Sequence, residues 1–355
     1  MKRWTGWLAA LCCLMLLCGA AVAQEGSWGQ INQPVERPEG WQQIVKDSPF
    51  ALGDTVELGE IGGQMMMEQS FGTYPSLDGS TVAVPMALEF ARQMLSLAEE
   101  DLPGFVFFST THNAYVHLIE KQENGSPMIA SQNVAMEEGH PVDLIIATEP
   151  SDEELALAEA HGVTLVQKPV CYDAFVFITH VDNPVESLTV DEIRKIYQGE
   201  ITNWKEVGGE DSPIDPYQRE PNSGSQTAME KLVMQGEQLK AAVPTYVVDG
   251  MSGLVERIGS YDNSARSLGY TYKYYIDTLY KNDAIKIIAI DGVSPTDENL
   301  RSAAYPFTTS YYGVHRAGEE QDTGGLFLDW MLSEEGQRCI QQAGYIPVTA
   351  LPDAP

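Results

Sequence analysis

The sequence predicts an α/β fold. Short apolar runs, typical of buried strands, alternate along the chain with amphipathic stretches that have helical spacing. The 355 residues are enough for about two domains of ordinary size, and 43% of them are hydrophobic, so the chain can bury a substantial core. No internal repeat, coiled coil or low-complexity tract interrupts the pattern. Together these observations favour two doubly wound lobes with a binding crevice between them.

Residues 1–23 are interpreted as an export signal. A short basic head at Lys2 and Arg3 precedes an apolar run over residues 7–20, and residues 21–23 (AVA) match a signal-peptidase site. A retained membrane anchor is the alternative, but the apolar run is shorter than the roughly 20 residues that span a bilayer. We therefore expect an exported protein, in a periplasm or at a cell surface.

The cysteines bear on anchoring and on the redox state. Lipidation of Cys18 would tether the exported protein to a membrane, but residues 15–17 (MLL) are bulky where lipoprotein signals carry small side chains. Cys171 and Cys339 are the two cysteines beyond the signal, too few to define a disulfide framework. We expect two buried free thiols, with a single disulfide bridge as the alternative.

Residues 24–55 are polar and are interrupted by Pro34, Pro38 and Pro49, so we interpret them as a leader that joins the signal to the fold. From about Val56 the chain changes to alternating strand and helix patterns. The buried strands are expected at residues 105–108, 143–147, 174–178 and 285–290.

The helices between these strands carry recognisable start and stop signals. A helix after Pro85 places four small or apolar side chains on one face, two capping boxes mark helix starts, and two glycines mark helix ends. The side chains on the shared face are Ala87, Ala91, Met94 and Ala98. The capping boxes are Ser151 with Glu154 and Thr189 with Glu192, and the glycines at helix ends are Gly199 and Gly236.

The charge balance excludes several classes of partner. Asp and Glu number 51 against 21 Lys and Arg, a formal net charge of −30 that repels nucleic acid and anionic membrane surfaces. We therefore expect no nucleic-acid or membrane-surface ligand. The same charge is unfavourable for small anions at long range, so an anion site would have to act at contact distance.

The strongest local motif is an anion cradle at residues 219–227 (REPNSGSQT), directly before a helical stretch at 228–233. Ser223, Gly224 and Ser225 offer free backbone N–H groups and two hydroxyls at the positive end of a helix dipole. Arg219 can add a two-pronged contact to an anion. The alternative is an ordinary capped helix with a surface arginine nearby.

Two further hydroxyl-rich segments precede helices. Residues 78–81 (DGST) lead into the helix that contains Pro85, and residues 109–111 (STT) follow a predicted strand and precede a helical stretch. Serine and threonine are common helix caps, so each segment alone means little. Three such helix starts in one α/β chain, whose strand ends face a common crevice, favour one shared anion site.

Other chemistries leave no comparable pattern. The sequence lacks a phosphate-binding Walker loop, an HExxH zinc helix and a GxSxG nucleophile elbow. His112 and His117 are five residues apart and lie on different helix faces, and residues 65–67 (MMM) fit a partly buried strand better than a copper site. We expect no metal, no cofactor and no enzyme activity.

Several longer segments of the sequence resemble those of a known protein family. Residues 196–209 (IYQGEITNWKEVGG), followed by Arg219 and the Ser-Gly-Ser at 223–225, resemble the signature of phosphate-binding proteins that feed ABC-type phosphate importers. Further matches cover residues 74–81 (YPSLDGST), 183–185 (NPV), 336–337 (GQ) and 344–347 (GYIP), so the resemblance runs over nearly the whole of the chain beyond the leader.

The resemblance implies a two-lobed Venus-flytrap of the type II periplasmic-binding-protein class, with two crossover segments. We place the crossings near Cys171 and Tyr305, so that lobe 1 is residues 56–172 plus 306–355 and lobe 2 is residues 173–305. The implied function is an extracytoplasmic, monomeric receptor that binds inorganic phosphate and delivers it to an ABC transporter permease. A secreted phosphatase-like enzyme and a phosphate-sensing surface protein without a transport role are the alternatives.

The resemblance also implies the phosphate contacts. One of Thr110 and Thr111 is expected in the second loop, where relatives have more glycine, and Asp143 is expected as an acidic contact. A carboxylate only accepts hydrogen bonds, so it would be satisfied by the proton of phosphate and repelled by sulfate, which has none. The alternative is that Asp143 is an ordinary residue at a strand start. The full set is Ser80, Thr81, Thr110, Thr111, Asp143, Arg219, Ser223, Gly224 and Ser225.

Overall fold

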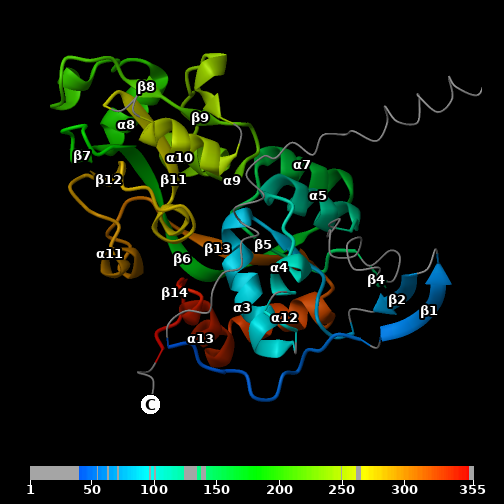
Figure 1. Cartoon of the computed structure of the whole chain (residues 1–355). Coiled ribbons are helices and arrows are strands. Elements are labelled where there is room, and N and C mark those ends of the chain that lie inside the picture. Colours follow the sequence, from blue (N-terminus) through cyan, green and yellow to red (C-terminus); the bar gives the residue numbers. More distant parts are fainter. Residues whose placement is uncertain are drawn as a thin grey trace, which may run out of the picture.

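The computed structural model is a mixed α/β structure in which one long strand runs through both halves of the main sheet (Figure 1). The structure describes residues 40–53, 55–61, 64–69, 72–95, 97–99, 101–123, 134–136, 141–248, 250–260 and 265–351. The expected α/β class is confirmed, whereas the export signal and Cys18 lie outside the described residues. Within these residues, no helix is long and apolar enough to span a bilayer.

The long strand is β6 (Leu165–His180). Its first part pairs antiparallel with β13 (Thr308–Arg316). From Phe175 on, it pairs antiparallel with β11 (Ser267–Tyr272) and then β12 (Ile285–Ile290). The partner strands therefore change in the middle of β6, and each set of partners belongs to a different group of helices (Figure 1).

The first group surrounds β3 (Leu77–Gly79) and β5 (Leu144–Ala147), which are parallel neighbours, and β5 also pairs with β13. Short connections lead from these strands into helices. The other elements of this group are η1 (Thr81–Ala83), α3 (Val84–Met94), α4 (Leu102–Phe105), α5 (Thr111–Glu120), α7 (Asp152–Ala160), α12 (Thr323–Met331), α13 (Glu334–Gln342) and β14 (Ile346–Pro347).

The second group surrounds β11 and β12. A short helix, α9 (Gly224–Ala228), runs directly into the π-helical η3 (Met229–Met234), so that the backbone is helical from 224 to 234. The other elements are β7 (Ser187–Leu188), α8 (Val190–Gln198), η2 (Trp204–Val207), β8 (Asp215–Pro216), β9 (Gln218–Arg219), η4 (Pro244–Tyr246), β10 (Val247–Val248), α10 (Met251–Gly259), η6 (Tyr275–Leu279) and α11 (Asp297–Arg301).

A separate small sheet is formed by β1 (Thr55–Ile61), β2 (Gln64–Gln69) and β4 (Val134–Met136). β1 and β2 are antiparallel, and β4 is parallel to β2. The run of three methionines at 65–67 lies within β2, so the expected strand is confirmed.

The local helix signals correspond closely to the structure. Both capping boxes form: Ser151 with Glu154 begins α7, and Thr189 with Glu192 begins α8. Gly199 ends α8 with a φ of +78°, a left-handed conformation that glycine adopts without strain. The helical segment before Gly236 ends at Met234, and Gln235 is its C-cap.

The structure differs from the sequence prediction at residues 105–108, where a strand was expected. α4 ends at Phe105, and the chain from Val106 to Phe108 is irregular and forms no strand. Val106 and Phe108 are nevertheless buried in the core. The prediction was wrong because an apolar run indicates only that its residues are buried. An irregular segment can be buried as well as a strand. Similarly, α3 ends at Met94, so Ala98 does not extend its face.

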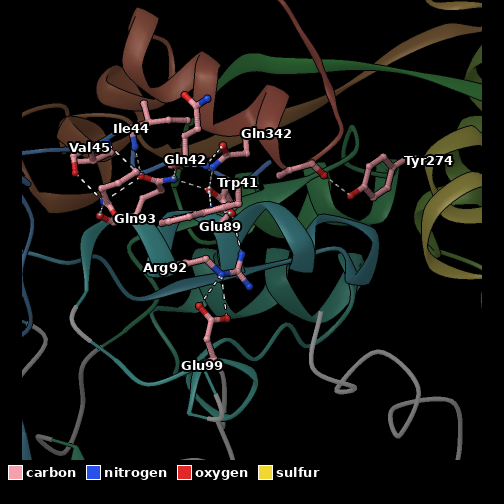
Figure 2. A network of polar contacts seen from close by, with 12 residues as sticks. Trp41, Gln42, Ile44, Val45, Glu89, Arg92, Gln93, Glu99, Tyr274 and Gln342 are labelled. Carbon is pink, nitrogen blue, oxygen red and sulfur yellow. Dashed lines mark hydrogen bonds and ion pairs between the residues drawn. The ribbon is translucent and has the colours of Figure 1, made fainter. Parts of the chain in front are cut away.

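Residues 41–53, which the sequence suggests are part of a polar leader, pack against the first group. Val45 and Phe50 are buried, and Phe50 contacts the rings of Phe327 and Trp330 at centroid distances of 4.9 and 6.4 Å. We call residues 41–45 the N-terminal strap. The strap is held by a polar network centred on a buried carboxylate in α3, that of Glu89 (Figure 2).

Cys171 and Cys339 are buried free thiols, as expected. Burial raises the pKa of both groups, so neither is a reactive thiolate near neutral pH. Cys171 lies in β6 and Cys339 in α13, and both belong to the continuous core that the two halves of the sheet share.

Candidate functional site

The carboxyl ends of β3 and β5 lie side by side and open the candidate site. The two strands are parallel, with Gly79 opposite Ile146. Ser80, the next residue after β3, donates its backbone N–H to the carbonyl of Ile146 at 2.9 Å. Ser80 and Thr148 therefore both follow strands at the same edge of the sheet, where α/β proteins bind ligands.

The second contact segment leads into α5. Thr111 is the first residue of this helix and is buried, and Thr110 is its N-cap. Thr110 has φ = +90° and ψ = 161°, a region that is open essentially only to glycine, and its side chain makes no capping hydrogen bond. Holding a β-branched residue there costs about 1–3 kcal/mol, so the surroundings must impose the conformation.

Gly224 brings the anion cradle of the second group against these two segments. A β-carbon added to Gly224 would lie 2.6 Å from Oγ1 of Thr148 and 2.9 Å from Oγ1 of Thr111. Any other residue here would force the side chains of these two threonines to shift. Thr111, Thr148 and Gly224, which are far apart in the sequence, thus meet at one point.

The side-chain hydroxyl of Thr148 lies beside Gly224 and Thr111. Its side chain is buried, and Oγ1 has no hydrogen-bond partner among the described residues. Two hydroxyls beside it donate to main-chain carbonyls: that of Tyr272 to the carbonyl of Gly224 at 2.9 Å, and that of Tyr115 to the carbonyl of Thr148 at 2.8 Å. A buried hydroxyl without a partner is costly, and a bound ligand would satisfy it.

Arg219 is buried at the end of β9 and holds a fixed orientation. Its Nε and Nη2 donate to the two oxygens of Glu220 at 3.0 and 2.6 Å, and Nε also donates to the carbonyl of Val248 at 3.0 Å. Nη1 donates to Oγ of Ser225 at 3.2 Å. The guanidinium is therefore tied to the cradle, and its carboxylate partner is Glu220 and not Asp143.

The cradle itself is a capped helix start. Ser223 is the N-cap of α9, and its Oγ accepts the backbone N–H of Gln226 at 3.2 Å. Gly224 and Ser225 are buried in the first turn. Backbone N–H groups, two hydroxyls and one guanidinium are thus concentrated beside Thr111 and Thr148, a set that suits a small anion.

Lys231 and Asn222 join the segment that contains the cradle to the start of α7. Lys231 donates to the carbonyl of Pro150 at 2.8 Å and lies 3.3 Å from the carboxylate of Asp152. Asn222 donates its side-chain amide to Glu153. These contacts close one side of the site, because α7 begins only a few residues after Thr148.

Asp143 does not lie with the other expected contacts. It precedes β5, and its carboxylate accepts the backbone N–H of Ser76 at 2.8 Å. Thr148 follows the opposite end of the same strand, roughly 16 Å away at about 3.3 Å per residue. This places Asp143 at the edge of the sheet away from the crevice, so the structure does not bring it together with Arg219.

The carboxylate at the crevice end of β5 is Glu149, which sequence reasoning missed. Glu149 follows Thr148 directly and accepts the hydroxyl of Tyr312 at 3.1 Å. Burial raises the pKa of Tyr312 to about 12, and the neighbouring Glu149 adds to the shift. The missed signal was available, since residues 148–149 follow a predicted strand and carboxyl ends of strands face the crevice.

The site contains no cluster that suits a metal ion. No group of three or more His, Cys, Asp or Glu side chains able to hold one occurs in the part of the chain that the structure describes. The polar groups gathered here are hydrogen-bond donors, the guanidinium of Arg219 and the carboxylates of Glu149 and Glu220.

Comparisons with known proteins identify the family of this chain. A family model described as a PBP superfamily domain matches residues 79–335. The phosphate-binding proteins PstS of Bacillus subtilis and Borreliella burgdorferi are 29% and 26% identical over 57% and 50% of this chain. These matches span 65% and 64% of the relatives, so the chain covers less than two thirds of their length.

Solved structures extend the likeness over more of the chain. One, from Clostridium perfringens, is described as a phosphate ABC transporter substrate-binding protein with bound phosphate, and it aligns with a TM-score of 0.57 at 25% identity, covering 78% of this chain and 100% of that one. An ABC-type phosphate transport receptor from Vibrio cholerae aligns at 0.53 and 20% identity over 76% and 98% of the two chains, which supports the two-lobed fold. Since the family model spans well over half of the sequence, the chain belongs to the PBP superfamily.

Proposed function

We propose that this protein is an extracytoplasmic receptor that captures inorganic phosphate between two lobes and delivers it to an ABC-type permease. The observation that carries the proposal is the meeting of Thr111, Thr148 and Gly224 beside Arg219 and the cradle. The buried hydroxyl of Thr148 has no hydrogen-bond partner there among the residues that the structure describes. Relatives and solved neighbours described as phosphate-binding support the identity of the anion.

The proposed lobes follow the change of partner strands in β6. Lobe 1 comprises residues 56–172 and 306–355, and lobe 2 comprises residues 173–305. The strands β3, β5 and β13 then belong to lobe 1, and β11 and β12 to lobe 2. In this division the crevice lies between the ends of β3 and β5 on one side and α9 on the other, and Lys231 and Asn222 reach across it.

The proposed contacts keep most of the expected set. Of the two threonines in the second loop, Thr111 is favoured because its Oγ1 faces Gly224. Glu149 takes the acidic role in place of Asp143, and Thr148 is added. The proposed site is Ser80, Thr81, Thr111, Thr148, Glu149, Arg219, Ser223, Gly224 and Ser225, with Thr110 shaping the loop.

We further propose that the protein acts as a monomer and without catalysis. Support comes from its membership of a superfamily of binding proteins and from a site built of donors that bind an anion without a nucleophile. Neutral donors and a single guanidinium would hold the anion at contact distance, which explains how a chain with net charge −30 can bind phosphate.

Isothermal titration of the mature protein tests this function. Inorganic phosphate should bind at 1:1 stoichiometry with micromolar or tighter affinity, and sulfate should give little heat. Equal binding of the two anions would contradict the proposed role of the carboxylate, and absence of phosphate binding would contradict the function. Turnover of a phosphomonoester by the purified protein would instead favour a phosphatase.

A further inference from the structure

A buried carboxylate lies beneath two of the contact segments without belonging to the proposed phosphate contacts. Asp78 is fully buried in β3. Its Oδ1 accepts the backbone N–H groups of Gly79 and Ser109, each at 2.7 Å. Its Oδ2 accepts the hydroxyl of Ser109 at 2.6 Å and lies 2.8 Å from Nδ1 of His117. Every acceptor position is therefore used within the protein.

These hydrogen bonds join two distant parts of the chain into one unit. Gly79 leads directly to Ser80 and Thr81, whereas Ser109 leads directly to Thr110 and Thr111. A buried carboxylate is tolerated only when donors surround it, and bonds to a charged acceptor are stronger than bonds to a neutral one. Asp78 thus fixes the start of the second contact segment relative to the first.

The fixed segment includes the strained threonine. Ser109 is held at both its N–H and its hydroxyl by Asp78, and its carbonyl accepts the side-chain amide of Asn113 at 3.0 Å. On the other side, the carbonyl of Thr110 accepts the N–H of Ala114 at 2.9 Å. Thr110, with φ = +90°, is therefore clamped on both sides, and relaxation of its backbone would shift the first turn of α5.

We propose that Asp78 is a positioning residue that keeps the segment 109–111 in its strained conformation and so directs the hydroxyl of Thr111 at the crevice. The part of this inference that concerns affinity rests on the proposed phosphate site. The alternative is that Asp78 only stabilises the fold, as any buried and hydrogen-bonded acid does. The two roles differ in whether the effect of losing the carboxylate depends on strain at Thr110.

A double-mutant cycle between Asp78→Asn and Thr110→Gly separates these roles. Asparagine removes the negative charge, so the N–H and O–H groups that bonded to a carboxylate face a neutral amide, which weakens the clamp. Glycine adopts φ = +90° without strain. Titrated with inorganic phosphate, Asp78→Asn should weaken binding at least tenfold in the wild-type background and less than threefold in the Thr110→Gly background. Equal losses in both backgrounds would overturn the proposal.

A second measurement applies the same double-mutant cycle to the ligand-free proteins. Hydrogen exchange of the backbone amides of residues 109–114 should accelerate at least tenfold in Asp78→Asn, and Thr110→Gly should largely remove that acceleration. Unchanged exchange would contradict the proposal about Asp78. If the variants show the expected exchange pattern but the wild-type protein does not bind phosphate, only the proposed function is contradicted. Failure of the proposal about Asp78 and failure of the proposed function are therefore distinguishable.

Glu89→Gln is the matched control. Glu89 is equally buried and also accepts several side-chain donors, from Trp41, Arg92, Gln93 and Gln342, but it holds the N-terminal strap and not a contact segment (Figure 2). This variant should lower the melting temperature and leave phosphate affinity and exchange of residues 109–114 unchanged. If it reproduces the effects of Asp78→Asn, Asp78 has only a structural role.

A milder variant covers the case in which Asp78→Asn does not fold. Ser109→Ala removes one hydrogen bond to Oδ2 and leaves the backbone N–H bond in place. It should change affinity and exchange in the same direction by a smaller factor, and Thr110→Gly should again reduce the change. Absence of any change in a folded Ser109→Ala protein would overturn the clamp.

Discussion

At the scale of single residues, the two acids that flank β5 differ in what they can contact. Asp143 precedes the strand and is bound by the N–H of Ser76, whereas Glu149 follows it, next to the unpartnered hydroxyl of Thr148. A carboxylate can accept the proton that phosphate retains near neutral pH, but it repels sulfate, which offers none. Position in the strand therefore decides which of the two acids can select between the anions.

Glu149→Gln should accordingly reduce the preference for phosphate over sulfate. The amide keeps the shape of the side chain and can donate to sulfate, so sulfate binding should rise and phosphate binding should fall, each about tenfold or more. Competition titration of the two anions measures the ratio. Asp143→Asn is the control and should leave the ratio unchanged, although it weakens the bond to Ser76. A larger change in the control would restore Asp143 as the selective acid.

At the scale of elements, the sequence predicts what is decided locally. The capping boxes at Ser151 and Thr189 form because their partners are three residues away on the same helix. Which end of β5 meets the crevice depends on its pairing with β3 and β13, which distant parts of the chain supply. The helix start at 223–225 could thus be predicted from sequence, whereas deciding which of Asp143 and Glu149 lies at the crevice end of β5 required the topology. Asp78 was missed for the same reason, since its partner Ser109 follows a segment that the sequence pattern alone assigns wrongly to a strand.

Lys231 offers a prediction at this scale, because it joins the helical segment 229–234 to the start of α7. Its hydrogen bond to the carbonyl of Pro150 exists only when the proposed lobes are together. Lys231→Met should therefore raise the dissociation rate of phosphate about three- to tenfold and change the association rate little, as stopped-flow measurements would show. Lys195→Met removes an ion pair with Asp191 that lies within α8, and it should change neither rate. Equal effects of the two variants would show that the contact between Lys231 and Pro150 does not slow the release of phosphate.

At the scale of the whole molecule, both halves of the sheet meet at a buried acid in β6. The carboxylate of Asp173 accepts the N–H of Tyr274 at 3.2 Å and the hydroxyl of Tyr311 at 2.9 Å, which belong to the two proposed lobes. Tyr274 also stacks on Tyr345. The hydroxyl of Tyr274, which Figure 2 shows, donates to the carbonyl of Ala343 at 2.7 Å. Asp173 and these two stacked rings line a cavity of about 220 Å³. The junction between the proposed lobes is thus a polar cluster around the carboxylate of Asp173.

The pKa of Asp173 gives this junction a pH dependence. Burial raises the pKa to about 6, against the hydrogen bonds to Ala174, Tyr311 and Tyr274 and the nearby Lys273, which lower it. Between the usual pKa of an aspartate and about pH 6, the folded protein binds more protons than the unfolded chain, so the stability contributed by this group falls as pH rises through that range.

Asp173→Asn removes the titration, and the Tyr311 hydroxyl can turn to accept from the amide. The variant should be more stable than wild type at pH 7 by on the order of 2–3 kcal/mol, with the difference shrinking toward pH 4. Denaturant titrations of the ligand-free proteins at several pH values measure it, and a difference that does not vary with pH would mean that Asp173 is ionised throughout.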